Sequence, residues 1–190
     1  ARERARSANS IGNQRQVGSS IMLYANDNDD HLVPGSSFWN ILLQQGYIGD
    51  STTLSAATAK IAVCPSDPAP LHWQVTKVSY AYNDRINFPN SDGNTRMKIS
   101  SMGKWISTIP LICDQWKYKY VINKTTDTYY IKFMCGAYAN VGKYAAHGKN
   151  LNWVRLDGGV TSSDYIYYCS SSGRMDPWNA NYESQWAPKR

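Results

Sequence analysis

Residues 1–28 have the spacing of a single helix. Small or apolar side chains recur at intervals of three, four or their sums, which places them on one stripe of a helix. The segment also contains Ala, Arg, Gln, Glu and Met, which are good helix formers. The stripe consists of Ala1, Ala5, Ala8, Ile11, Gly18, Ile21 and Ala25.

The predicted helix is unevenly apolar. Small residues dominate the stripe until the run Ile21–Tyr24. We therefore expect its C-terminal end to pack on the rest of the chain, and the remainder to project or to contact another subunit. The opening from Ala1 to Arg6 has neither an N-cap residue nor a proline, the usual signals of a helix start. We accordingly expect the helix to continue upstream of Ala1.

Turn residues end this helix, and a shorter helix follows. The run Asn26–Asp30 consists of Asn and Asp, which favour turns and tolerate left-handed backbone. Residues 38–48 place one Trp and two Leu on one face, and Gly46 suits a helix end. Two helices are therefore expected before the first strand.

The rest of the chain is patterned as strands. Alternating or short apolar runs bounded by turn residues indicate strands, and Asp157-Gly158 between two of them indicates a tight hairpin turn. Residues 97–102 fit a short strand or a turn. The predicted strands cover residues 77–83, 110–114, 118–122, 129–133, 150–156 and 160–169.

Helices followed by a run of strands predict an α+β fold. We expect a long N-terminal helix packed on an antiparallel β-sheet, with a loop-rich C-terminal region. The chain of 190 residues is long enough for one domain with a core. We divide it into a helix over 1–30 and a globular β domain over 31–190.

Composition and charge narrow the class of protein. Hydrophobic residues make up 42% of the chain, which excludes a disordered protein. The 14 Tyr and 7 Trp favour half-buried strands and wet interfaces. The net charge of +6 lies mostly near the two ends, and no nucleic-acid-binding motif accompanies it, so we expect no nucleic-acid partner.

Four cysteines leave the disulfide state open. None forms a Cys-x-x-Cys pair, so the sequence does not indicate a zinc ribbon or a thioredoxin-like site. An even number in a β domain rich in Tyr and Trp fits an oxidising compartment. Disulfides in one of three pairings and four buried thiols are both open for Cys64, Cys113, Cys135 and Cys169.

Several segments, in order along the chain, resemble one family. They are residues 1–10, 14–18 and 24–28, Trp39 with Leu42-Leu43, Cys64-Pro65-Ser66-Asp67, and Ser79–Asn83. They are similar to the post-membrane part of prepilin-type proteins related to the major pseudopilins of type II secretion. The resemblance implies a pilin-like fold.

The most specific match is His147, nine residues, then Asp157-Gly158. It resembles the His-x9-Asp-Gly signature of the subgroup associated with prepilin processing. Many members carry a Cys at the position of Ser10, as a partner for the Cys of Cys-Pro-Ser-Asp. With Ser10 here, the resemblance leaves Cys64 single or paired elsewhere.

The resemblance implies a structural subunit of a type II secretion or type IV pilus-like filament, and not an enzyme. It implies a precursor that a prepilin peptidase cleaves and methylates, and an upstream segment in the inner membrane. The domain would lie in the periplasm or in an extracellular filament, with other pilin-like subunits and the secretion machinery as partners. Assembly would use the small Ala1, Ala5 and Ala8 for close approach, and Arg2, Glu3, Arg4 and Arg6 for ion pairs between subunits.

His147 and Asp157 allow two interpretations. One is a small metal or ligand site at the two ends of one strand, and the other is a structural His and a hairpin turn. A strand of this length spans ~30 Å, so the two side chains do not meet unless the segment bends.

Calcium is a further candidate ligand, and no other cofactor is expected. The acidic run at 26–30 lacks the Gly and the Glu of an EF-hand loop. Oxygen ligands could come instead from Asp164 and Asp176, with Asn179 and Asn181 nearby.

Two other functions were weighed against the filament subunit. An enzyme is not expected, because no nucleophile motif and no paired catalytic carboxylates are recognisable. A secreted carbohydrate-binding or adhesin module is the alternative, since sugars stack on exposed aromatic rings. Its candidate rings are Trp73, Trp105, Trp116, Trp153, Trp178 and Trp186.

Overall fold

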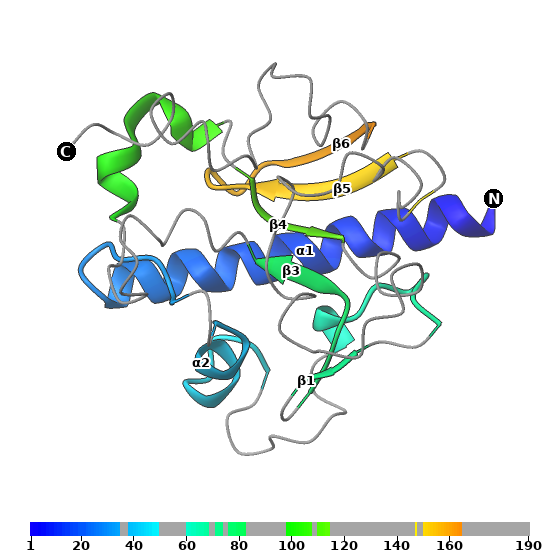
Figure 1. The fold of residues 1–190 in the computed structure, drawn as a ribbon, viewed down its shortest axis with the longest axis horizontal. Helices are drawn as coiled ribbons and strands as arrows, with labels where there is room; N and C mark the ends of the chain where they lie inside the picture. Colours follow the sequence, from blue (N-terminus) through cyan, green and yellow to red (C-terminus); the bar gives the residue numbers. More distant parts are fainter. Residues whose placement is uncertain are drawn as a thin grey trace, which may run out of the picture.

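A computed structural model shows an α+β fold built on one long N-terminal helix (Figure 1). The helix lies against an antiparallel sheet, as predicted. A shorter helix and two 3-10 segments complete the described part of the chain. The structure describes residues 1–34, 38–49, 60–68, 71–73, 76–82, 98–107, 110–114, 147 and 150–164.

Helix α1 covers Arg2–Asp27 and ends where the acidic run predicted. Asn28 donates its side-chain amide to the Tyr24 carbonyl at 2.8 Å, which satisfies one of the last carbonyls of the helix. Asp29 and Asp30 then adopt left-handed backbone, with φ of 52° and 66°. The chain turns there because Asp tolerates this conformation better than most residues.

Four strands form the main sheet, in the order β3-β4-β5-β6 with every pair antiparallel. Helix α1 contacts β4, β5 and β6, so it covers one face of this sheet (Figure 1). The predicted strands at 110–114 and 150–156 are confirmed, and so is the start of the strand predicted at 160–169. The strands are β3 (Tyr80–Tyr82), β4 (Pro110–Asp114), β5 (Asn150–Arg155) and β6 (Val160–Asp164).

The prediction of one strand over 77–83 was wrong. The segment divides at Ser79 into β2 (Thr76–Val78), which pairs with β1 (Leu71–Trp73), and β3, which pairs with β4. The Ser79 amide donates to the Ala62 carbonyl at 2.8 Å, which removes it from either ladder. The alternation runs through both strands, so the pattern alone does not show the break.

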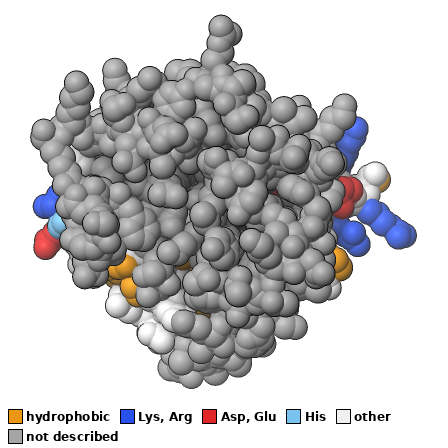
Figure 2. Space-filling model, in the orientation of Figure 1, with side chains coloured by type: hydrophobic (Ala, Val, Ile, Leu, Met, Phe, Trp, Pro, Cys, Tyr) orange, Lys and Arg blue, Asp and Glu red, His pale blue; other side chains and the backbone are white. Residues whose placement is uncertain are grey.

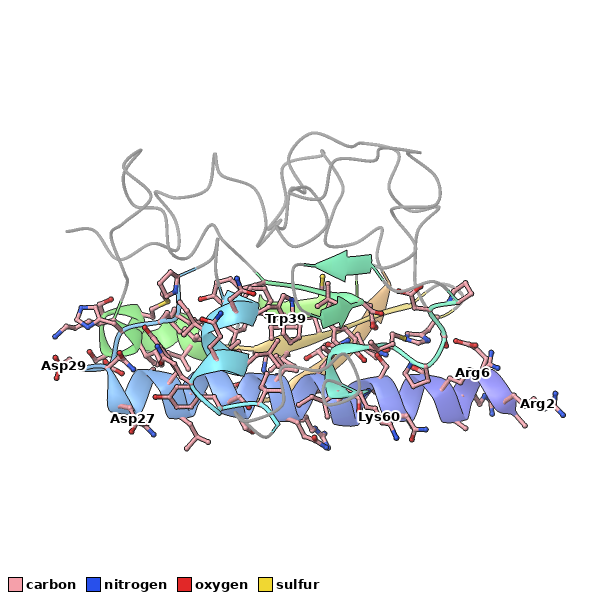
Figure 3. All side chains as sticks on the ribbon, turned by 90° about the horizontal axis from the view of Figure 1, so that it is seen from below. Arg2, Arg6, Asp27, Asp29, Trp39 and Lys60 are labelled. Atoms are coloured by element: carbon pink, nitrogen blue, oxygen red, sulfur yellow. The ribbon has the colours of Figure 1, made fainter. Side chains whose placement is uncertain are left out.

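Apolar side chains from both helices and the sheet form one core. Helix α2 (Phe38–Gln44) buries Phe38, Trp39, Leu42 and Leu43, as predicted, and Gly46 follows it with φ 76°. The Phe38 ring stacks on Tyr82 of β3 at 4.8 Å between centroids. In Figure 3, Trp39 points into the layer between α2 and the strands.

The sequence suggested a strand or turn over 97–102, and the described part of this segment, from Lys98 onward, forms neither a strand nor a simple turn. A 3-10 segment, η4, covers Ile99–Ser107. Ile99 and Met102 are buried and Ile106 is partly buried against the core. Their spacing of three and four is the helical signal that outweighs the short apolar run.

Burial along α1 extends further than its apolar stripe predicted. Ser10 and Gln14 are fully buried although both are polar. The expectation that only the C-terminal end packs on the domain was therefore wrong, because hydrogen bonds hold the middle of the helix as well. None of the described helices is both long and apolar enough to cross a membrane. The hairpin predicted at 118–133 and the tail from Ser170 lie outside the described residues.

Candidate functional site

A buried polar cluster lies between α1 and the edge where β4 ends and β5 begins. His147 is at its centre, and its side chain is only 3% exposed. Nδ1 of His147 lies 2.8 Å from Oε1 of Glu3. Nε2 lies 3.2 Å from Oδ2 of Asp114 and 3.7 Å from the Cys64 sulfur. One imidazole thus joins α1, β4 and the segment around Cys64.

The two carboxylates favour a charged imidazole. Burial opposes the charged form, but the hydrogen bonds to Asp114, Cys64 and Glu3 outweigh it and raise the pKa of His147 to about 10. For Glu3, slight burial acts against ionisation, and the hydrogen bonds from His147 and Ser66 still lower its pKa. The arrangement therefore favours the protonated, positively charged form of His147.

Asp114 is the last residue of β4, and two groups besides His147 donate hydrogen bonds to its carboxylate. The Ser10 hydroxyl donates to Oδ1 at 2.9 Å, and the Asn152 backbone amide donates to Oδ2 at 3.2 Å. The Tyr80 hydroxyl lies 3.2 Å from the Ser10 oxygen. Burial and then the nearby Asp114 charge raise the pKa of Tyr80, so its hydroxyl stays protonated. Because the Ser10 proton points to Asp114, the Tyr80 hydroxyl is the donor to the Ser10 oxygen.

The Cys-Pro-Ser-Asp segment forms a turn that contacts the start of α1. The Asp67 amide closes the turn on the Cys64 carbonyl at 2.9 Å. The Ser66 hydroxyl donates to Glu3 at 2.8 Å, and the Ser79 hydroxyl donates to Asp67 at 2.8 Å. Pro65 has no amide proton to leave unpaired in this turn. The structure therefore brings this motif together with His147.

His147 and Asp157 do not share a site. Asp157 lies beyond the far end of β5, where its carboxylate accepts hydrogen bonds from Arg155 at 3.0 Å and from the Gly159 amide at 2.8 Å. Gly158 has φ 80°, which favours glycine. The Asp-Gly end of the motif is a hairpin turn, as one of the two interpretations held.

The first residues of α1 lie at one end of the molecule. Figure 3 shows Arg2 and Arg6 at this end, opposite Asp27 and Asp29, and Figure 2 shows basic side chains gathered there. Of the residues expected to contact other subunits, Glu3 is engaged within its own chain by His147 and Ser66. All seven are exposed: Ala1, Arg2, Glu3, Arg4, Ala5, Arg6 and Ala8.

The calcium candidates do not converge in the described part of the chain. Asp164 ends β6, paired with Asn150, and Asp176 lies outside the described residues. Asp30, from the acidic run, accepts a hydrogen bond from the Ser100 amide at 2.7 Å and so holds a turn. The one group of metal-ligating side chains found among the described residues is Cys64, Asp114 and His147.

Sequence reasoning missed Asp114 and Ser10 as parts of a site. Asp114 closes a buried apolar strand, which is an unusual place for a carboxylate and the signal that could have identified it. Ser10 stood out only as a departure from the resemblance. Ser10 and Asp114 are 104 positions apart, so the spacing of residues along the sequence could not show that they meet.

One of the six Trp rings considered for sugar binding, that of Trp153, is buried. Trp153 of β5 is 4% exposed. It therefore offers no surface for stacking on a sugar. The side chains of Trp73 and Trp105, and the other three candidate Trp, lie outside what the structure describes.

Cys64 is a buried thiol without a disulfide. Cys113 is buried on β4, and Cys135 and Cys169 lie outside the described residues. Comparison with known proteins finds no match to this chain, whether among protein-family models, curated proteins or solved structures.

Proposed function

We propose that this protein is a pilin-like structural subunit of a type II secretion or type IV pilus-like filament. The observation that carries the proposal is the division of α1. Its later residues are built into the domain from Ser10 onward, and Ala1–Arg6 are exposed. The first turns of this 26-residue helix are bonded to the domain through Glu3 and still expose small and basic side chains, which suits them to contact helices of neighbouring subunits.

Side-chain types at the exposed end support this role. Ala1, Ala5 and Ala8 are small, so a neighbouring helix can approach their stripe closely. Arg2 and Arg4 are exposed beside them and can pair with acidic groups of another subunit. The sheet and the other elements packed on the later part of α1 would then face outward from a helical core.

The other properties of the proposal rest on the resemblance alone. They are a precursor processed by a prepilin peptidase, an inner-membrane segment upstream, a location in the periplasm or a surface filament, and an assembly role without catalysis. The sugar-binding alternative has no described feature in its favour.

Photo-crosslinking in cells tests the proposal. A photoreactive residue would replace Ala5 or Ala8 in the full-length protein, with Gln45, exposed after α2, as the matched control. Head-to-tail contacts that do not close give a ladder of crosslinked multimers, whereas a two-fold contact stops at dimers. We expect ladders at Ala5 and Ala8 that are stronger than at Gln45. Monomers only, or dimers only, would refute a filament subunit.

A further inference from the structure

We propose that Cys64, Asp114 and His147 bind a zinc ion. The cluster offers one thiol, one carboxylate and one imidazole, and their ligand atoms all lie within 4.8 Å of one another. All three residues are buried. The proposal is independent of filament assembly, because it rests only on groups within one chain.

The distances match a tetrahedral ion. Zinc bonds of about 2.3 Å to sulfur and 2.0–2.2 Å to nitrogen and oxygen place tetrahedral ligands roughly 3.4–3.6 Å apart. Nε2 of His147 lies 3.7 Å from the Cys64 sulfur and 3.2 Å from Oδ2 of Asp114. The Cys64 sulfur and a carboxylate oxygen of Asp114 lie within 4.8 Å of each other, so side-chain shifts can close the three groups around one ion.

The surrounding hydrogen bonds are those that metal ligands usually have. Glu3 binds the remote nitrogen of His147 at 2.8 Å, which directs Nε2 and its lone pair toward the other two ligands. This carboxylate–histidine pair is a common outer shell of zinc sites. On Asp114, Ser10 occupies Oδ1 and leaves Oδ2 facing His147.

The donor set favours zinc over the calcium considered from the sequence. Calcium takes oxygen ligands, whereas thiolate with imidazole and carboxylate suits zinc. The described residues supply three ligands, which leaves a fourth position for water or another donor. Glu3 is half exposed, so the cluster has a route to solvent on that side.

The ion would join segments that are far apart in sequence. Cys64 lies in the turn after η2 (Lys60–Ala62), Asp114 ends β4, and His147 precedes β5, with Glu3 of α1 attached to it. Binding to the folded chain alone stabilises the fold. A metal-free network of hydrogen bonds is the competing account of the same geometry.

Cobalt substitution separates the two accounts. The reduced, full-length chain, stripped with a chelator, would be titrated with Co²⁺ and then with Zn²⁺. We expect one ion per chain, a thiolate-to-cobalt charge-transfer band, and displacement of cobalt by zinc. Cys64→Ser should abolish the band, and Cys113→Ser, a buried cysteine beside Asp114 in sequence, should retain it. Glu3→Gln should weaken zinc binding by about 10- to 100-fold.

X-ray absorption of the zinc-loaded wild-type protein tests the same ligands without a variant, so its result does not depend on whether Cys64→Ser folds. The proposal requires one sulfur at about 2.3 Å with nitrogen and oxygen ligands. A spectrum with no sulfur or with several sulfurs would overturn it. So would a cobalt band that survives Cys64→Ser, or the absence of a 1:1 complex with either ion.

Discussion

The two halves of α1 are held to the protein by different kinds of interaction. In the C-terminal half, Val17, Ile21 and Ala25 are fully buried in the apolar core. In the N-terminal half the contacts are polar, through Glu3 to His147, Ser10 to Asp114, and a Ser7 hydroxyl that accepts from Asn152 at 3.1 Å. Apolar packing needs only shape, whereas each polar contact needs a particular partner.

The two halves of α1 therefore have different roles: one serves folding, and the other serves the functions that we propose. The apolar half fixes the helix in the domain through contacts that do not titrate. The polar half ends in residues that are exposed and available to other molecules, and its bond from Glu3 reaches a titratable side chain, His147. The filament contacts that we propose lie on this half, and the proposed zinc site of Cys64, Asp114 and His147 is attached to it through Glu3.

The largest effect is expected in the apolar half. Ile21→Ala should lower the free energy of unfolding by about 2–5 kcal/mol, because it removes packed atoms and leaves a cavity. Leu23→Ala is the control on the same helix, since Leu23 is 55% exposed, and it should change stability by about 0.5 kcal/mol or less. Chemical denaturation of both variants measures the difference. Equal losses would contradict the assignment of this face.

A polar contact should contribute less. Ser10→Ala is expected to cost about 1–3 kcal/mol, because Oδ1 of buried Asp114 loses its donor. Ser19→Ala, on an exposed position of α1, should stay within about 0.5 kcal/mol of the wild type. Denaturation with chelator present provides the comparison. A neutral Ser10→Ala would show that this half is not held by Asp114.

Stability of the metal-free protein should fall at alkaline pH. The pKa of His147 is about 10 in the folded chain and 6.5 ordinarily. Its contribution is therefore complete below the lower value and is lost as the pH rises through the higher one. For one proton the slope between them is at most about 1.4 kcal/mol per pH unit. His147→Gln should remove this extra slope in denaturation series with chelator. A variant and wild type with parallel pH profiles would contradict it.

The smallest effects concern two glycines of α1 and should have opposite signs. A Cβ on Gly18 would lie 2.8 Å from Cγ1 of the buried Val154, whereas a Cβ on Gly12 meets nothing within 4 Å. Gly12→Ala should stabilise by about 1 kcal/mol through helix propensity. Gly18→Ala should destabilise by about 1 kcal/mol, because overpacking exceeds the same gain. Thermal melts of the two variants measure the two signs. Equal shifts would show that α1 lies further from β5 than this structure has it.

Local features of the fold could be predicted from the sequence, and contacts between distant residues could not. The turn at Asp29 and Asp30 and the hairpin at Gly158 follow from the conformations that these residues tolerate. The division of the strand at Ser79 depends on a change of partner, which the alternation does not record. The His147 cluster draws on residues more than a hundred positions apart, so the sequence supplied two of its motifs without showing that they meet.

Hydrogen exchange along α1 tests the central claim most directly. Wild type and His147→Gln would be compared with chelator present, amide by amide. If polar bonds around His147 hold the N-terminal half, the variant should exchange at least about tenfold faster over residues 5–14 and unchanged over residues 17–27. Equal acceleration in both halves, or none in either, would contradict the account.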